Sequence, residues 1–337
     1  MEIEANIVEK SHTVNEIFRE YGESYEKSRP MTKEQRRLMR DMIDCRSGAL
    51  GGHVEQCDSC HKVHYRNHSC RNRSCPQCGG SARSEWLLGR SEELLNVPYF
   101  HVVFTIDHVW NPLMLINQQV CYNLFYETVN ALLKEYGQRY LGGEVGFIAV
   151  LHTWGQQLNY HVHPSATLRT SLHCIMIGGA LKAEGEFVTS RDEWLFPVEK
   201  LSADFRERYC LGLVKLHEAS KLRFGKGCEN EGIFAQMLVE SLAKKWEVYI
   251  KPPFGKPETV LEYLSGYVNR IGISNARILD VSDGRVTFRY RDYRDDGVEK
   301  SLTLPVHQFM QRFLLHVLPA GFVRIRYYGL WHPNQRH

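Results

Sequence analysis

The order of hydrophobic and polar positions along the chain predicts a mixture of helices and strands. The first forty residues follow helical periodicity, and Thr32 with Gln35 fits a capping box before the run KEQRRLMRDMI. Pro257 and Glu258 suit the first turn of another helix, PETVLEYLSGYVNR. The remaining helical patterns are the run SARSEWLLGRSEELL and the stretches near residues 112–137, 200–222, 233–246 and 305–317.

Apolar runs that are rich in β-branched and aromatic residues predict the strands. They are YFHVVFTI, VGFIAVLHTW, LHCIMIGGAL, WEVYI, ARILDV, GRVTFRYRDY and KSLTLP. Helices and strands do not alternate regularly, and the last strands follow one another directly. This order favours an α+β fold over a doubly wound parallel sheet.

Residues 45–80 show little periodicity and cannot build a hydrophobic core of their own, although they hold most of the ten cysteines. Two CxxC pairs in this segment, Cys57 with Cys60 and Cys75 with Cys78, have the spacing of zinc knuckles. Two such pairs can complete a tetrahedral site, so we expect a structural zinc ion held by these four thiolates. Candidate ligands of a second ion in the same segment are Cys45, His53, His64, His68 and Cys70.

The composition is that of a globular protein with two or three domains: 337 residues, 43% hydrophobic and 24% charged. The chain has no apolar run of the roughly 18 residues that a membrane span needs. Its polar N-terminus also lacks an apolar stretch of signal-peptide length, so we expect a cytoplasmic protein without a membrane partner. The net charge of +3 is too small to indicate nucleic acid by itself, although basic residues gather at 33–40, 66–73 and 324–336.

A histidine pair, His161 and His163, stands in an extended and apolar stretch. Strand alternation would place both imidazoles on one face of a sheet, where two nitrogen atoms can bind one cation. His173 in the next apolar run is a candidate third ligand, and Gln156 or Gln157 could serve instead. An isolated pair of this kind also fits two surface histidines on an edge strand.

Tyr263 and Tyr267 stand four positions apart in the helix that Pro257 opens, which brings both phenols to one side. A phenol has a pKa of about 10 and is a poor nucleophile at neutral pH. A divalent cation held by histidines can polarise a phosphodiester, and attack by a tyrosine then leaves a covalent phosphotyrosine and a free hydroxyl. A second tyrosine permits a second cleavage before the first is resolved. Taken alone, the pair also fits two tyrosines on the flank of a helix with their hydroxyls in water.

An ordered set of blocks resembles the HUH-type, two-tyrosine transposases of the insertion-sequence ninety-one family. The blocks run from about Cys45 to Arg326 and include CRSGALGGHVEQCDSC, SCRNRSCPQC, LHTWGQQLNYH, KPPFGKPETVLEYLSGYVNRIGISNARIL and FLLHVLPAGFVRIRYYG. The resemblance implies a zinc-binding domain followed by an HUH endonuclease-like catalytic domain, with a central antiparallel sheet flanked by helices. It implies that Tyr263 and Tyr267 are nucleophiles. It also implies a catalytic Mg²⁺ or Mn²⁺ ion held by residues at or near His161, His163 and His173.

The reaction implied by this resemblance is rolling-circle transposition, in which single-stranded DNA is nicked at an element end, linked to tyrosine through its 5′-phosphate and transferred to target DNA. The chain departs from the family in three places. The compact family run HPHVHC is divided here by PSATLRTS at 164–171. The working pair is therefore either His161 with His163 or His163 with His173, and we favour the first because it satisfies strand alternation. Ser74 and Asn269 stand where the family often has histidines.

The expected domain order is a helical segment (1–44), a zinc-binding domain (45–95), a catalytic domain (96–304) and a C-terminal helix with a basic tail (305–337). Single-stranded DNA would be bound through basic and aromatic side chains. The candidates are Arg71, Arg73, Arg324, Arg326 and Tyr327. One alternative is a zinc-module DNA-binding protein without nuclease activity. Another is a replication initiator or conjugative relaxase that uses the same chemistry.

Overall fold

A computed structural model describes residues 12–91, 94–158, 170–190, 195–251, 259, 272–292, 295 and 297–335. The chain forms two compact units that are interleaved in sequence. The first unit comprises residues 1–83, 155–160 and 269–317, and the second comprises residues 84–154, 161–268 and 318–337. This partition differs from the four consecutive segments expected from the sequence, because strands and a helix near the C-terminus complete the core of the N-terminal helices.

The first unit begins with two helices, α1 (Val14–Ser28) and α2 (Lys33–Asp44). Both start with a capping box, and the one formed by Thr32 and Gln35 confirms the expectation from the sequence. Helix α1 packs on α2 and on α9 (Val306–Leu314). The rings of Phe18 and Phe313 meet there with their centroids 5.5 Å apart.

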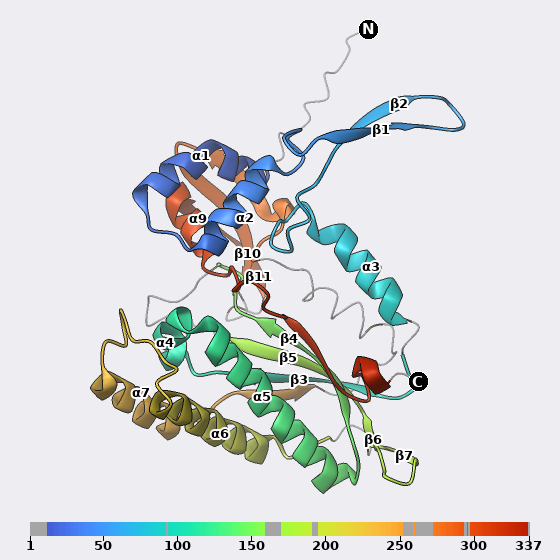
Figure 1. Cartoon of the computed structure of the whole chain (residues 1–337), viewed down its shortest axis with the longest axis vertical. Coiled ribbons are helices and arrows are strands. Elements are labelled where there is room, and N and C mark those ends of the chain that lie inside the picture. Colours follow the sequence, from blue (N-terminus) through green and yellow to red (C-terminus); the bar gives the residue numbers. More distant parts are fainter. Residues whose placement is uncertain are drawn as a thin grey trace. The chain divides into compact units, whose positions relative to one another are not determined.

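Two small antiparallel sheets belong to the same unit (Figure 1). Strands β9 (Ile278–Ser282), β10 (Arg285–Asp292) and β11 (Val298–Pro305) form one of them in the order β11-β10-β9. Alternation along β10 buries Val286 and Phe288 in the core of this unit. Strands β1 (Gly52–Gln56) and β2 (Val63–Asn67) form a largely exposed hairpin, and helix α3 (Gly79–Ser91) follows it in the chain.

A five-stranded sheet forms the centre of the second unit. Its order is β12-β4-β5-β3-β8, and every neighbouring pair is antiparallel. The strands are β3 (Tyr99–Thr105), β4 (Gly146–His152), β5 (Ser171–Ile177), β8 (Val248–Lys251) and β12 (Ile325–Gly329). The three strands in the middle are almost wholly buried, which explains why their sequences read as continuous apolar runs.

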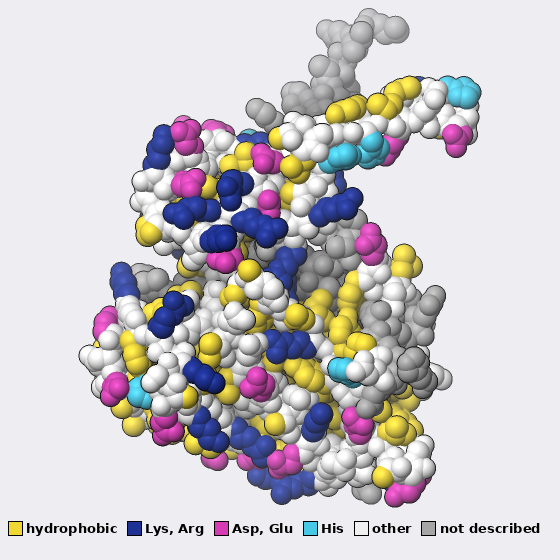
Figure 2. Space-filling view, in the orientation of Figure 1, with side chains coloured by type: hydrophobic (Ala, Val, Ile, Leu, Met, Phe, Trp, Pro, Cys, Tyr) yellow, Lys and Arg dark blue, Asp and Glu magenta, His cyan; other side chains and the backbone are white. Residues whose placement is uncertain are grey.

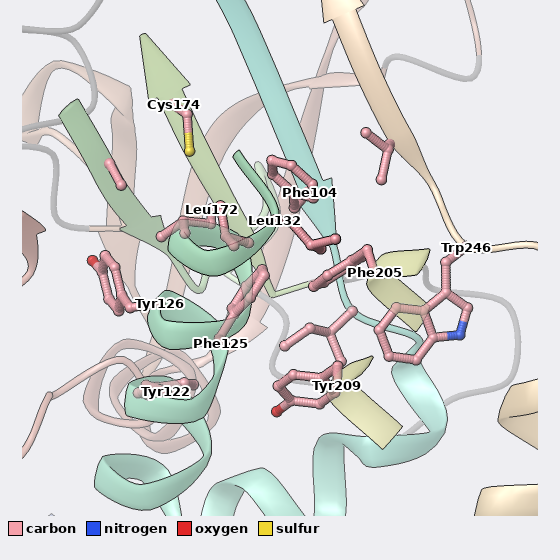
Figure 3. Packing of buried hydrophobic residues seen from close by; sticks show 14 of the residues in the cluster. Phe104, Tyr122, Phe125, Tyr126, Leu132, Leu172, Cys174, Phe205, Tyr209 and Trp246 are labelled. Carbon is pink, nitrogen blue, oxygen red and sulfur yellow. The ribbon is translucent and has the colours of Figure 1, made fainter. Parts of the chain in front are cut away.

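Helices cover one face of this sheet (Figure 1). They are η1 (His108–Trp110), α4 (Asn111–Ile116), α5 (Gln118–Tyr136), η2 (Gly137–Leu141), α6 (Val198–Glu218) and α7 (Glu231–Ala243). Phe205 of α6 joins this layer to the sheet (Figure 3). Its ring centroid lies 5.1 Å from that of Phe104, 5.5 Å from that of Phe125 and 5.2 Å from that of Trp246. Stacked and edge-on aromatic contacts of this kind dominate the core.

The opposite sheet face carries a smaller apolar cluster, in which Tyr99 stacks on Trp331 with ring centroids 5.5 Å apart. Ile148, Val150 and Ile175 complete its centre. The remaining short elements of this unit are β6 (Gly179–Leu181), β7 (Phe187–Thr189) and η4 (Pro333–Gln335), while η3 (Asn275–Arg277) belongs to the first unit.

These elements confirm the predicted α+β class and the central antiparallel sheet flanked by helices. The helical stretch expected near 112–137 divides at Asn117 into α4 and α5. The helix expected at 257–270 lies outside the described residues, apart from position 259. Among the helices that the structure describes, none is both long and apolar enough to cross a membrane.

Candidate functional site

Four cysteine side chains converge in the first unit. The sulfur atoms of Cys45, Cys70, Cys75 and Cys78 all lie within 4.8 Å of one another. The Cys45–Cys78 and Cys70–Cys78 sulfur distances are 3.6 Å, and the Cys45–Cys75 distance is 3.7 Å. Four sulfur atoms bound tetrahedrally at about 2.3 Å from one zinc ion would be about 3.8 Å apart. The donor set and its spacing therefore fit zinc.

Helices α1 and α2 hold this cluster against the core. Cys45 caps the C-terminal end of α2, and its backbone N–H donates to Asp41 O at 3.0 Å. The buried side-chain amide of Asn15 on α1 donates to Met42 O at 2.9 Å and lies 3.3 Å from Cys75 Sγ. Asn15 thus links both helices to the cysteine cluster, so the cluster and the helix pair form one packed structure.

Burial changes the ionisation of these thiols. It raises the pKa of Cys75 to about 11 and raises the pKa of Cys70 as well. For Cys78, burial also opposes ionisation, but hydrogen bonds from neighbouring thiols outweigh it and the pKa lies below its ordinary value. A divalent cation at the centre would favour the thiolate form of all these sulfurs, because it neutralises the charge that burial penalises.

The other CxxC pair does not take part in this cluster. Cys57 and Cys60 are exposed at the turn that joins β1 to β2, and neither belongs to the group of converging sulfurs. The site expected from two CxxC pairs is therefore corrected: Cys45 and Cys70 complete it instead. The CxxC spacing specifies a tight turn, and the end of a hairpin needs the same kind of turn. The spacing does not indicate that the hairpin places this turn away from the other cysteines.

The rest of the cysteine-rich segment is polar and largely exposed. The candidate ligand His53 lies on β1 outside the cluster, with its Nε2 3.0 Å from a carboxylate oxygen of Glu55. Two candidate DNA contacts, Arg71 and Arg73, are exposed on the short stretch between the cysteines at 70 and 75. Figure 2 shows further Lys and Arg side chains gathered over the helices of the first unit. The basic run at 33–40 contributes to them, since its arginines are exposed on α2.

Three histidines meet on the sheet of the second unit, on the face opposite to the covering helices. His101 lies on β3, His152 on β4 and His173 on β5. The Nδ1 atom of His173 lies 3.1 Å from His101 Nε2. On its other side, His173 Nε2 lies 3.4 Å from His152 Nδ1 and 3.1 Å from Ser171 Oγ. His173 is therefore the centre of a chain of three imidazole rings.

Of the three histidines that were predicted to bind the cation, only His173 belongs to the described residues. His161 and His163 lie outside them, as do both predicted nucleophiles, Tyr263 and Tyr267. His101 and His152 were not predicted as ligands from the sequence. Each lies within a predicted apolar strand, but only the pairing of β3 and β4 with β5 brings these histidines to His173.

Burial keeps two of these rings neutral. It lowers the pKa of His101 to about 3, with smaller contributions from His173 and Lys251. Burial also lowers the pKa of His173 to about 4, assisted by the positive charges of Arg324 and Lys251. A neutral imidazole has one nitrogen lone pair, which can accept a hydrogen bond or bind a metal ion.

A tryptophan and an arginine lie beside the histidines. The rings of His152 and Trp154 meet edge-on, with their centroids 4.5 Å apart, and the guanidinium carbon of Arg324 lies 4.3 Å from the Trp154 ring centroid. The Nε of Arg324 donates to Leu151 O at 3.0 Å, which fixes the side chain. A guanidinium and an indole next to imidazoles form a surface suited to phosphates and bases of a nucleic acid.

The two other C-terminal candidates have different surroundings. Arg326 lies over the ring of Tyr126, 4.0 Å from its centroid, and donates to the side-chain oxygen of Asn123. The hydroxyl of Tyr327 accepts a hydrogen bond from Trp86 Nε1 at 3.0 Å. Both side chains are thus engaged in packing within their unit, whereas Arg324 lies next to the histidines.

The segment that leads to His161 is fixed by side chains of the first unit. The backbone carbonyl oxygens of Gln156, Gln157 and Leu158 accept hydrogen bonds from Arg277, Arg312 and His316, respectively. Leu158 is fully buried, and a Cβ added to Gly272 would lie 2.5 Å from its Cδ2. The last described residue before the predicted histidines therefore touches the first described residue after the predicted tyrosines.

Comparison with known proteins gives matches over most of the chain. The family described as "Putative transposase" matches residues 146–337, and the one described as "Transposase zinc-binding domain" matches residues 17–106. "Putative transposase y4qJ" of Sinorhizobium fredii (strain NBRC 101917 / NGR234) is 41% identical over 323 residues, which cover 94% of this chain and 79% of that protein. "Transposase for insertion sequence element IS801" of Pseudomonas savastanoi pv. phaseolicola is 26% identical over 301 residues, 86% of this chain and 68% of that protein. No solved structure matches.

Proposed function

This chain belongs to the IS91 family of transposases, and from that membership we propose that it cuts and rejoins single-stranded DNA through a tyrosine-linked intermediate. The reaction is rolling-circle transposition, in which one strand is nicked at an element end and transferred to a target. The nucleophiles are Tyr263 and Tyr267. The DNA partners are single-stranded element ends and target DNA.

The proposed chemistry is a transesterification at phosphorus. The phenol oxygen of one tyrosine attacks the phosphodiester, the bond from phosphorus to the 3′ oxygen breaks, and that oxygen takes up a proton. The 5′ end of the cut DNA remains on the enzyme as a phosphotyrosine. A 3′ hydroxyl can later attack this ester, which restores the phenol and rejoins the strand. The second tyrosine allows another strand end to be held before the first is released.

The proposed catalytic ion is Mg²⁺ or Mn²⁺, held by His161, His163 and His173. When bound, such an ion stabilises the charge that develops on the phosphoryl oxygens. The surroundings of His173 suit this role, because the ring is neutral and its Nε2 atom lies next to Ser171 Oγ. Imidazole ligands favour Mn²⁺ over Mg²⁺, which prefers oxygen ligands.

The contact between Leu158 and Gly272 is the observation that carries the proposal. His161 is three residues beyond Leu158, and Tyr267 is five residues before Gly272. An extended chain spans at most about 3.6 Å per residue, so each of these connections is short. Because Leu158 and Gly272 touch, both segments start from one point. This supports a common site for the histidines and the tyrosines.

We propose that the converging sulfurs of Cys45, Cys70, Cys75 and Cys78 hold a structural zinc ion. Four thiolates leave no coordination position open for a substrate, so the ion would contribute to folding and not to the reaction. The ion would fix the stretch that carries the exposed side chains of Arg71 and Arg73. A second, non-catalytic contact with DNA phosphates would follow from that arrangement.

A covalent adduct tests this function. The full chain is incubated with Mn²⁺ and single-stranded DNA that spans an end of the element, and the products are separated on a denaturing gel. We expect a protein–DNA adduct that disappears when both Tyr263→Phe and Tyr267→Phe are introduced. Firm DNA binding without any adduct would contradict the proposal and favour a DNA-binding protein without nuclease activity.

A further inference from the structure

His152 is the last residue of β4 in the second unit, next to the neighbouring strand β5. It is directly opposite Ser171 in the pairing of β4 with β5, and it lies diagonally across from His173. Its Nδ1 atom is 3.4 Å from His173 Nε2, and Ser171 Oγ is 3.1 Å from that same nitrogen. Polar atoms from two neighbouring strands thus gather around one imidazole nitrogen.

The spacing of the two nitrogen atoms fits a shared metal ion. Imidazole nitrogens bind Zn²⁺ at about 2.0–2.1 Å, so two of them at angles between about 90° and 109° on such an ion are about 2.9–3.4 Å apart. The distance of 3.4 Å between His152 Nδ1 and His173 Nε2 falls within this range.

His101 is placed to orient His173. Its Nε2 atom lies 3.1 Å from His173 Nδ1, and the two rings are stacked with centroids 5.2 Å apart. The His101 ring is only 2% exposed and belongs to a central strand, so it has little freedom to move. If His101 accepts the Nδ1 proton of His173, the lone pair of His173 is on Nε2, which faces His152. Histidine ligands of metal ions commonly have such a hydrogen-bond partner on the other ring nitrogen.

We propose that His152 is a further ligand of the divalent cation bound by His173, with Ser171 beside them, and that His101 is a positioning residue for His173. The role of the ion in the reaction rests on the proposed transposase function, but the binding site does not. Histidine from a neighbouring strand would thereby supply a ligand in a chain whose histidine run is divided at 164–171.

The positive charges near the histidines affect how tightly a cation binds at this site. Arg324 and Lys251 both act on His173 electrostatically. Such charges oppose the binding of a cation by itself, and a DNA phosphodiester would offset them. We therefore expect Mn²⁺ to bind more tightly when single-stranded DNA is present.

Titration with Mn²⁺ tests the site directly. The zinc-loaded full chain is titrated with and without a single-stranded oligonucleotide, and free Mn²⁺ is measured by electron paramagnetic resonance. We expect His152→Ala to weaken binding at least about tenfold. His108→Ala is the matched control, because His108 is a partly exposed histidine of η1 in the same unit, and it should leave the affinity unchanged.

The positioning role of His101 is tested by comparing the Mn²⁺ affinities of two variants at this position. His101→Leu, which removes the acceptor, should weaken Mn²⁺ binding by about 10- to 100-fold. His101→Gln, which keeps an acceptor, should restore most of the affinity. A residue needed only for packing would show no such difference between folded leucine and glutamine variants, and that result would contradict the assignment of His101.

Further measurements distinguish a loss of Mn²⁺ binding from a loss of folding. Circular dichroism and zinc content identify folded variants, and His152→Gln serves as a second, larger substitution at that position. Pulsed resonance of Mn²⁺ in the wild-type chain should detect imidazole nitrogens, and their absence would overturn the site without any variant. If the wild-type chain forms the adduct and the His152 variants bind Mn²⁺ as tightly as the wild type, the cation site is contradicted but the tyrosine chemistry is not. Mn²⁺ binding that depends on His152, without any adduct, would contradict the tyrosine chemistry alone.

Discussion

Leu158 packs on Gly272 so closely that a Cβ atom at position 272 would lie 2.5 Å from Leu158 Cδ2. Both residues have positive φ, 55° for Leu158 and 21° for Gly272. A bulky side chain with positive φ is a strained conformation, which persists only where the surroundings enforce it. Here a buried leucine side chain and hydrogen bonds to three consecutive carbonyl oxygens enforce it.

Gly272→Ala should separate the two segments. The added methyl group collides with Leu158, so we expect the chain to lose about 1–3 kcal/mol of stability to denaturant. Adduct formation should fall more than DNA binding, because the proposed histidine and tyrosine segments would lose their common anchor. Gly89→Ala is the control, since nothing lies within 4 Å of a Cβ at position 89. Equal behaviour of the two variants in urea unfolding and in the adduct assay would argue against the anchor.

Removal of a carbonyl contact should act on the same segment without a steric clash. Arg312 Nη1 donates to Gln157 O at 3.1 Å, so Arg312→Ala frees one of the three carbonyl oxygens. We expect a rate of adduct formation lower by about tenfold, equivalent to about 1.4 kcal/mol, the size of one hydrogen bond to a charged group. Arg285→Ala removes an exposed arginine of the same unit and should change nothing. A rate for Arg312→Ala equal to that of Arg285→Ala would contradict the positioning role of this contact.

Zinc content should distinguish the two CxxC pairs. Cys75→Ser removes one of the converging sulfurs, and we expect loss of bound zinc together with protease sensitivity in residues 45–80. Cys57→Ser changes an exposed sulfur at the end of the hairpin and should retain that zinc ion. Elemental analysis of both purified variants provides the measurement. If Cys57→Ser lost as much zinc as Cys75→Ser, the four-sulfur assignment would be wrong.

The salt dependence of DNA binding should distinguish two neighbouring arginines. Arg324 lies on Trp154 beside the histidines, and Arg324→Ala should weaken binding and lower the salt slope by about one phosphate contact. Arg326 is held by Tyr126 and Asn123, so Arg326→Ala should lower the melting temperature and leave the salt slope unchanged. The same slope in both variants would remove Arg324 from the proposed DNA surface.

Local patterns predicted the elements well because they depend on neighbouring residues. The capping box at Thr32 requires only residues three positions apart, and the strand runs required only short apolar stretches. The sheet order β12-β4-β5-β3-β8 could not be predicted in this way, because it pairs residues that are far apart in the chain. For the same reason, His101 and His152 could not be predicted as part of the site, because they become neighbours of His173 only through strand pairing.

The cysteines show the same limit in another form. The CxxC spacing correctly indicated two turns, and the abundance of thiols correctly indicated a site that fits zinc. Which sulfurs converge depends on the length and direction of the β1–β2 hairpin and on the packing of Asn15 against Cys75. Neither can be deduced from spacing, so the sequence alone indicates Cys45 and Cys70 only as candidate ligands of a second ion.

Mass spectrometry of the covalent DNA adduct can identify the residue that attacks the DNA. Trypsin does not cleave before proline, so Tyr263 and Tyr267 share one tryptic peptide, residues 246–270. After nuclease digestion of the DNA, we expect this peptide to carry a nucleotide through a phosphate on one of these two tyrosines. Attachment of the nucleotide to a different peptide, or a chain that cleaves DNA without any attached nucleotide, would contradict the proposed mechanism.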